Sequence, residues 1–244
     1  IGYGSVPLNE AVVDSHSVFA YPFLIGRRAE PTDSDARAIG RSIGFLHKKL
    51  KSITSKGIFR QKALKWLEFL EKTARTASSG GIKNFPVRAS SELCSNILFV
   101  KTAQDRAGDQ PLHGDLNFGN ILICDDTAEA VILDYENVSR SFGSPVLDLA
   151  FAIERFCFPP KAGSIDCGSL ARNLIAGYSA TGSPIANAES WFSSSLEILN
   201  LRCLAALAAV AAEGKPVPKG EIEKFLSLLA DIPRKAQILS RWTN

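Results

Sequence analysis

The sequence of 244 residues contains no methionine and only three histidines and five cysteines. About five methionines are expected in a chain of this length. Their absence indicates that the sequence begins inside a longer protein, or that it omits its methionines, so that some spacings are one residue short. No apolar run reaches the roughly 18 residues that span a bilayer, because the longest, 201–212, is interrupted by Arg202. We expect this run to form a buried helix.

The cysteines are scattered, form no CxxC pair and are odd in number, so at least one stays unpaired within a chain. Zinc sites need clustered ligands, and the three histidines lie far from any cysteine pair. Scattered cysteines are typical of reduced thiols in the cytosol. Residues 1–10 have neither the basic start nor the apolar block of a secretory signal. These features predict a cytoplasmic protein with no membrane partner.

An excess of charge of one sign is also missing, since 28 basic and 25 acidic side chains leave a net charge of +3. Dedicated nucleic-acid binders carry a clear basic excess. We therefore expect no nucleic-acid partner, whereas the oligomeric state is left open. The apolar fraction of 45% is that of an ordinary globular protein with a sizeable core.

Most of the chain has apolar residues at helical spacing, broken by turn-forming clusters. A strand is expected at 17–25, ending at Gly26, and Pro22 restricts it to the edge of a sheet. Two apolar runs around a polar turn at 125–129 predict a β-hairpin. Its strands are 121–124 and 131–134, and the predicted helices are 33–50, 59–76, one within 90–104, 147–156, 170–179, 191–212 and 221–241.

The hairpin brings together the side chains that phosphoryl transfer needs. Such a reaction requires a carboxylate to orient the attacking hydroxyl and oxygen ligands to hold magnesium against the phosphates. Asp115 follows a glycine in the loop before the hairpin, and Asn120 stands where the first strand begins. Asp134 ends the second strand, beside Asn120, and amide and carboxylate oxygens suit magnesium.

The stretch HGDLNFGN at 113–120, followed by LDYE at 133–136, resembles the catalytic motif of aminoglycoside phosphotransferases and choline and ethanolamine kinases. The resemblance implies that Asp115 is the catalytic base and that Asn120 and Asp134 hold Mg²⁺. It also implies that His113 supports the loop through hydrogen bonds and does not act as the base. Glu136, in the choline-kinase-like form DYE, is expected to be a further metal ligand or a partner in a loop ion pair.

Further segments resemble the same superfamily, over about 18–156. GSP at 143–145 and DLA at 148–150 are similar to its G-x-P…D-L-A segment, in which Asp148 would support the catalytic loop. YPFLIG at 21–26 resembles the segment that links the two lobes, which implies that Tyr21 and Phe23 contact the adenine ring. Leu46-His47 resembles the Leu-His pair that ends a long helix after the hinge, and for His47 a core or capping position is favoured over a catalytic role.

The resemblance implies an α+β, protein-kinase-like fold: a mostly helical C-terminal lobe with a catalytic β-hairpin. Residues 1–25 are expected to be a remnant of the N-terminal lobe and the hinge, and residues 26–244 the helical lobe with the catalytic loop and acceptor-binding region. No lysine precedes Lys48, so neither a phosphate-binding lysine nor a glycine-rich loop can be assigned.

The expected activity is transfer of the γ-phosphate of ATP or GTP, with Mg²⁺, to a hydroxyl group of a small molecule. The alternative is a non-catalytic nucleotide-binding or scaffold domain; protein kinase activity is disfavoured because protein kinases have arginine at the position of Gly114. The acceptor stays open. Four acids suit a cationic acceptor and two aromatic residues suit a quaternary amine, although a solvated or core position is favoured for each. These residues are Glu154, Asp166, Glu189, Glu197, Tyr178 and Trp191.

Overall fold

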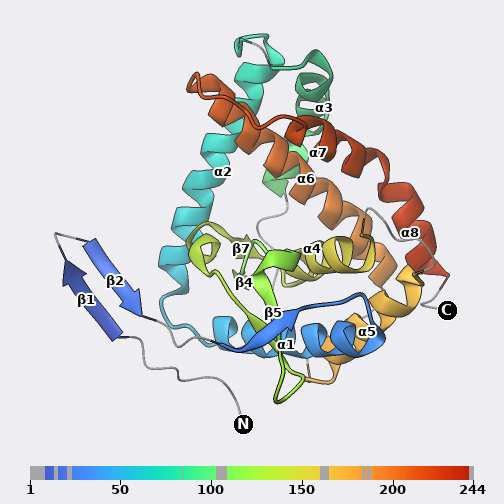
Figure 1. Cartoon of the computed structure of the whole chain (residues 1–244). Helices are drawn as coiled ribbons and strands as arrows, with labels where there is room; N and C mark the ends of the chain where they lie inside the picture. The colour runs from blue at the N-terminus through green and yellow to red at the C-terminus, as the bar shows by residue number, and fades with distance from the viewer. Residues whose placement is uncertain are drawn as a thin grey trace.

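The computed structural model describes residues 9–13, 16–20, 24–83, 85–102, 109–159, 165–182, 185 and 188–241. This part of the chain forms eight α-helices and three small antiparallel sheets, one of which lies apart from the helices (Figure 1). The helices are α1 (Asp33–Lys51), α2 (Lys56–Ser78), α3 (Val87–Thr102), α4 (Val146–Cys157), α5 (Cys167–Ser179), α6 (Ala188–Ala212), α7 (Glu221–Ala230) and α8 (Ile232–Ser240). This arrangement confirms the predicted α+β class and its mostly helical character.

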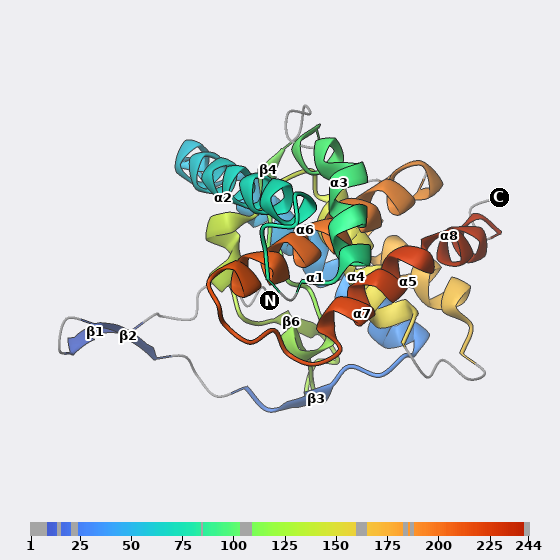
Figure 2. The ribbon, with the colours of Figure 1, turned by 90° about the horizontal axis from the view of Figure 1, so that it is seen from above.

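The central sheet carries the predicted hairpin. Strand β5 (Ile121–Cys124) pairs with β6 (Ala130–Ile132) on one side and with β3 (Gly26–Arg28) on the other. Short strands β4 (Gln110–Pro111) and β7 (Phe142–Gly143) also pair. A separate hairpin of β1 (Asn9–Val13) and β2 (His16–Ala20) lies apart from the helices in both Figure 1 and Figure 2.

Helices α1 and α5 pack closely because each presents a glycine to the other. A Cβ at Gly40 would collide with the Leu174 carbonyl, and one at Gly177 with the Arg37 carbonyl. Thr32 is the N-cap of α1: its hydroxyl accepts a hydrogen bond from the Asp35 amide at 3.3 Å. The Asp35 carboxylate also binds the Arg27 guanidinium of β3 at 2.7 Å and 2.9 Å, which ties β3 to α1.

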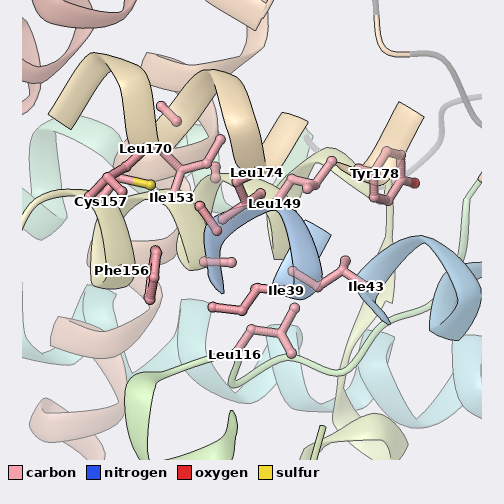
Figure 3. Close-up of a cluster of buried hydrophobic side chains, with 14 of the residues drawn as sticks. Ile39, Ile43, Leu116, Leu149, Ile153, Phe156, Cys157, Leu170, Leu174 and Tyr178 are labelled. Carbon is pink, nitrogen blue, oxygen red and sulfur yellow. The ribbon is translucent and has the colours of Figure 1, made fainter. Parts of the chain in front are cut away.

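The main core lies between α1, α4, α5 and the central sheet (Figure 3). Ile39, Leu149 and Leu174 meet there and are completely buried. Leu116 and Phe156 extend the cluster to the loop before β5, and Phe118 stacks on Phe156 with ring centroids 5.2 Å apart. The loop that carries the predicted catalytic residues is therefore anchored in the core.

Helix α6 runs through a second cluster, formed with α2, α3 and α7. Its segment Trp191–Ala212 is long and apolar enough to cross a membrane by length and composition, and half of that window is buried inside the fold. Leu201, Leu204 and Ala208 belong to this buried set, as the prediction of a buried helix at 201–212 requires. All five cysteines are free in the structure.

Several predicted boundaries are wrong. The strand expected at 17–25 is β2, which ends at Ala20, and the unpredicted β3 begins at Gly26 because its neighbour β5 supplies the pairing. The helix expected at 221–241 is two helices that meet at Asp231, with Pro233 in the first turn of α8. Strand β6 ends at Ile132, so Asp134 lies beyond the strand and not at its end.

Candidate active site

The predicted catalytic segment is the loop 112–120, between β4 and β5. At its start, the Leu112 amide donates to the Ser141 carbonyl at 2.9 Å, and the Leu112 side chain packs against Leu147 and Ile198. At its end, the 3-10 turn η1 (Phe118–Asn120) leads directly into β5. Both ends are held by buried groups, so the loop presents its polar side chains in a fixed orientation.

The Asp148 carboxylate holds the backbone of this loop. Its Oδ2 accepts from the His113 amide at 2.7 Å and its Oδ1 from the Gly114 amide at 2.9 Å. His47 Nε2 donates to Oδ2 at 3.1 Å. Burial alone would raise the pKa of Asp148, but the His47 ring and the two amides outweigh burial and lower this pKa below its ordinary value. Asp148 is therefore an ionised acceptor at neutral pH.

His47 connects Asp148 to two more elements. Its Nδ1 lies 3.0 Å from the Tyr178 hydroxyl of α5, and its backbone carbonyl accepts from Gln110 Nε2 at 3.0 Å. Burial, followed by the charge of Asp148, raises the pKa of Tyr178 to about 12, so this hydroxyl keeps its proton. His47 is 2% exposed, as the predicted core position requires.

Gly114 is the residue at which the loop turns. Its φ of 79° lies in the left-handed region, where side chains other than glycine are strained. A Cβ at Gly114 would also collide with the Ser141 hydroxyl and lie 2.7 Å from the Ser141 Cβ. The turn points the His113 amide and the Gly114 amide toward Asp148, whose carboxylate accepts a hydrogen bond from each of them.

Two side-chain amides orient the Asp115 carboxylate. Asn117 Nδ2 donates to Oδ1 at 2.9 Å, and Asn120 Nδ2 donates to Oδ2 at 3.2 Å. Asn120 Nδ2 also donates to the Asp115 carbonyl at 2.9 Å. The next residue, Leu116, is buried in the core. Asp115 itself is half-buried, so its carboxylate is both fixed and accessible.

His113 connects the loop to the far end of the hairpin. Its Nδ1 accepts from the Asp115 amide at 3.3 Å, and its Nε2 donates to the Leu133 carbonyl at 2.9 Å. The Leu133 amide in turn donates to the Asn120 carbonyl at 2.8 Å, which continues the pairing of β5 and β6 by one residue. Asp134 thus directly follows Leu133, which is hydrogen-bonded to both His113 and Asn120.

Asn120 and Asp134 fit a hard divalent cation. The Asn120 Nδ2 donates both of its hydrogen bonds to oxygens of Asp115. Its Oδ1 accepts no hydrogen bond from any described residue and is therefore available to a metal ion. Asp134 is exposed, and its backbone φ of 61° is left-handed. Its Oδ1 accepts one long hydrogen bond from the Glu136 amide at 3.4 Å. Such oxygen ligands are those that Mg²⁺ prefers.

Glu136 is exposed and begins the 3-10 turn η2 (Glu136–Arg140). Within the described part of the chain its carboxylate makes no ion pair. No group of three His, Cys, Asp or Glu side chains that could hold a metal gathers among the described residues. The expected set of metal ligands therefore includes the Asn120 amide oxygen, which is not one of these side-chain types. The role of Glu136 as a metal ligand remains a prediction.

Tyr21 and Phe23, predicted to contact adenine, lie outside the described residues. The sequence reasoning missed Asn117, which both caps η1 through the Gly119 amide at 2.7 Å and orients Asp115. An Asx residue directly before a glycine-containing turn is the signal for such a cap. The sequence reasoning also missed the hydrogen bond between His47 and Asp148, because sequence spacing alone does not indicate that contact.

Solved structures with a similar fold include small-molecule kinases, which confirms the predicted kinase-like resemblance at the level of the fold. No protein-family model and no curated protein sequence matches the chain.

Three neighbours illustrate the likeness. A spectinomycin phosphotransferase solved with ADP and spectinomycin has a TM-score of 0.58 and 13% identity, over 95% of this chain and 74% of that one. An amicoumacin kinase solved with AMP-PNP and Ca²⁺ has a TM-score of 0.60 and 15% identity, over 93% and 69%. The choline kinase of Cryptosporidium parvum has a TM-score of 0.56 and 11% identity, over 98% and 78%.

Proposed function

We propose that the protein is a small-molecule kinase that transfers the γ-phosphate of ATP or GTP to a hydroxyl group. The observation that carries the proposal is the Asp115 carboxylate, held by Asn117 and Asn120 on a loop anchored by buried Asp148. A carboxylate fixed in this way can orient an acceptor hydroxyl and accept its proton as the oxygen attacks phosphorus. The neutral amides leave its negative charge intact.

Asn120 and Asp134 are the residues that would hold the metal ion. A bound Mg²⁺ would neutralise charge on the nucleotide phosphates. His113 would hold the two loops in register, since it bonds the Asp115 amide and the Leu133 carbonyl. With both nitrogens engaged in this way, the ring has no free lone pair left to serve as the base.

The division of labour along the chain is part of the proposal. Residues 26–244 would form the lobe that carries the catalytic loop and binds the acceptor, and residues 1–25 would belong to the hinge and the other lobe. Tyr21 and Phe23 would contact the nucleotide base. The neighbours solved with ADP and AMP-PNP support a nucleotide as the phosphate donor.

The test is replacement of Asp115 by Asn in the full-length protein, measured by nucleotide consumption over a panel of hydroxyl compounds and by nucleotide binding. Loss of a base typically lowers the rate by about 10²–10⁴-fold, while AMP-PNP affinity should change little. Asp126→Asn, in the exposed turn between β5 and β6, is the matched control. An unchanged rate in the Asp115 variant would remove Asp115 as the base. No turnover with any acceptor, in spite of AMP-PNP binding, would favour the non-catalytic alternative.

A further inference from the structure

Four helices form a pocket of about 290 Å³ on the C-terminal half of the molecule. Helix α6 packs against α3, α7 and α8, and each of these four helices contributes to the wall. In Figure 1, α3 and α7 lie at the end of the molecule opposite α1 and β5. None of the residues that line the pocket belongs to the loop 112–120 or to the hairpin of β5 and β6. The pocket is therefore separate from the proposed active site.

The corner between α7 and α8 supplies an apolar wall. Leu226 and Ile232 are buried, Leu229 is half-buried, and Pro233 completes the wall at the first turn of α8. Pockets for small molecules are typically lined by apolar side chains, with a few polar groups that fix the orientation of the ligand. The volume lies near the lower end of the usual range for such pockets. It suits a ligand whose apolar body is about one or two rings in size.

The opposite wall carries charge, and the acids are the more deeply placed groups. Arg88 and Glu92 are one turn apart on α3 and therefore share a face of that helix, and Glu197 lines the pocket from α6. Arg88 is exposed, whereas Glu92 and Glu197 are both partly buried. The two carboxylates exceed the single guanidinium by one negative charge. Charge interacts more strongly where water is partly excluded, so this wall favours a cation.

Glu197 differs from the other acids that the sequence offers for a cation. Glu154 binds the Lys235 ammonium at 2.7 Å, and Asp166 caps α5 by accepting from the Ser169 amide at 3.0 Å. The side chain of Glu189 lies outside the described residues. Among the residues that the structure describes, none forms an ion pair or a side-chain hydrogen bond with Glu197. Its carboxylate is therefore available to a ligand in the pocket.

The basic residues nearest to the pocket along α8 do not neutralise Glu197. Arg234, which follows Pro233, donates to both carboxylate oxygens of Asp231, at 2.6 Å and 2.7 Å. The next residue, Lys235, is buried against Glu154, and its second acid, Asp231, lies 3.7 Å away. Both cations are thus held by acids outside the pocket wall.

We propose that this pocket is a second ligand site, distinct from the proposed active site, and that its ligand is a small amphipathic amine. The ammonium group would bind Glu197, with Glu92 close by, and the apolar body would lie on Leu226, Leu229 and Ile232. A hydrogen bond between an ammonium and a carboxylate is among the stronger contacts of its kind. A hydrated metal ion would leave the apolar wall unused, and an anion would meet the excess negative charge. The proposal does not depend on the kinase function.

Three compounds that share one apolar body test the preference for a cation. Tryptamine, tryptophol and indole-3-propionate carry an ammonium, a hydroxyl and a carboxylate on the same indolyl-ethyl group. Titration calorimetry on the full-length protein at low salt measures their affinities without any turnover. We expect tryptamine to bind about tenfold more tightly than tryptophol, and indole-3-propionate to bind most weakly. Equal affinities, tighter binding of either of the other two compounds, or no binding of tryptamine at millimolar concentration would overturn the proposal.

Variants of the wall locate the binding. Glu197→Gln should lower the affinity for tryptamine about tenfold and leave that for tryptophol nearly unchanged. Glu223→Gln, at an exposed acid of α7 outside the pocket wall, is the matched control and should change either affinity by less than about twofold. Ala230→Leu adds bulk at an exposed position of the wall and should weaken both compounds, with an unchanged thermal melt as the check on folding. Unchanged binding of tryptamine in Glu197→Gln and Ala230→Leu would show that it binds elsewhere and would refute the site.

Competition separates this pocket from the proposed active site. Tryptamine has no hydroxyl group and so cannot itself be an acceptor. AMP-PNP with Mg²⁺ should not displace it, and Asp115→Asn should leave its affinity unchanged. Displacement by AMP-PNP, or by a hydroxyl compound that the protein phosphorylates, would assign the amine to the active site and contradict a separate pocket, while leaving the kinase function intact. Binding of tryptamine that depends on Glu197 supports the pocket even if no compound is phosphorylated.

Discussion

Replacing Asp148 by Asn tests how far the catalytic loop depends on one buried carboxylate. The Asn side chain has nearly the same shape, so packing is kept, but one acceptor oxygen becomes a donor. The amide nitrogen must then face either the Gly114 amide or the pair formed by the His113 amide and His47 Nε2. At least one hydrogen bond to a charged group is lost, at a cost of about 1.5–3 kcal/mol, and a buried donor is left unpaired at about 1–3 kcal/mol.

We therefore expect Asp148→Asn to lower the free energy of unfolding by about 3–5 kcal/mol at pH 7. Guanidinium unfolding measures this as a lower midpoint with an unchanged m-value, because the surface exposed on unfolding stays the same. Asp126→Asn removes an exposed carboxylate and should change stability by less than about 0.5 kcal/mol. Phosphate transfer should fall as well, because the backbone on either side of Gly114 loses its anchor.

The pH dependence gives a second test of the same reasoning. The folded-state pKa of Asp148 lies below its ordinary value, so its stabilising effect is complete above the unfolded-state pKa of about 3.9. The effect is lost as the pH falls through the folded-state pKa. The difference in stability between wild type and Asp148→Asn should thus be constant near neutral pH and narrow below about pH 4. A loss below about 1 kcal/mol at pH 7, or a constant difference down to pH 3, would refute the argument.

Two further variants probe other buried contacts. Lys235→Leu removes the cation that hydrogen-bonds buried Glu154 and leaves it only Arg155 at 3.8 Å, so it should cost about 3–5 kcal/mol of unfolding free energy. The double replacement with Glu154→Leu should recover most of this loss; thermal melts measure both, and equal losses would contradict the pairing. Gly114→Ala forces a side chain into left-handed backbone against Ser141 and should cost about 1–3 kcal/mol and slow transfer. Ser141→Gly should restore part of both, and a neutral Gly114→Ala would show that the loop relaxes freely.

The fold class, the hairpin and most helices could be predicted because their signals are local. Apolar spacing and end residues define α1, whose observed bounds, Asp33–Lys51, differ by one residue from the prediction. Strand β3 could not be predicted, since one glycine and two arginines give no apolar alternation and become a strand only by pairing with β5. The break between α7 and α8 was missed because Pro233 is tolerated in the first turn of a helix and the apolar spacing continues across it.

The candidate site divides in the same way. Asp115, Asn120 and Asp134 were predicted because the hairpin register brings them together from within one short stretch of sequence. Asp148 is held by the His113 and Gly114 amides of the loop and by His47 of α1, which lies 101 residues from Asp148 in the sequence. No local pattern indicates such a contact. The capping role of Asn117 could have been predicted from its position before a turn. Its hydrogen bond to Asp115 could not, because that contact depends on the loop geometry that Gly114 imposes.

The catalytic loop with its hairpin indicates the type of reaction, whereas the acceptor is a separate question. The loop and hairpin hold the proposed base through side-chain amides and a buried carboxylate. The neighbours that share the fold include kinases with different named substrates. The helices pack around this loop, with Phe118 of the loop stacked on Phe156 of α4. At 11–15% identity the neighbours' substrates cannot be transferred to this chain. The proposed acceptor therefore has to be found by experiment on this chain, with the panel of hydroxyl compounds.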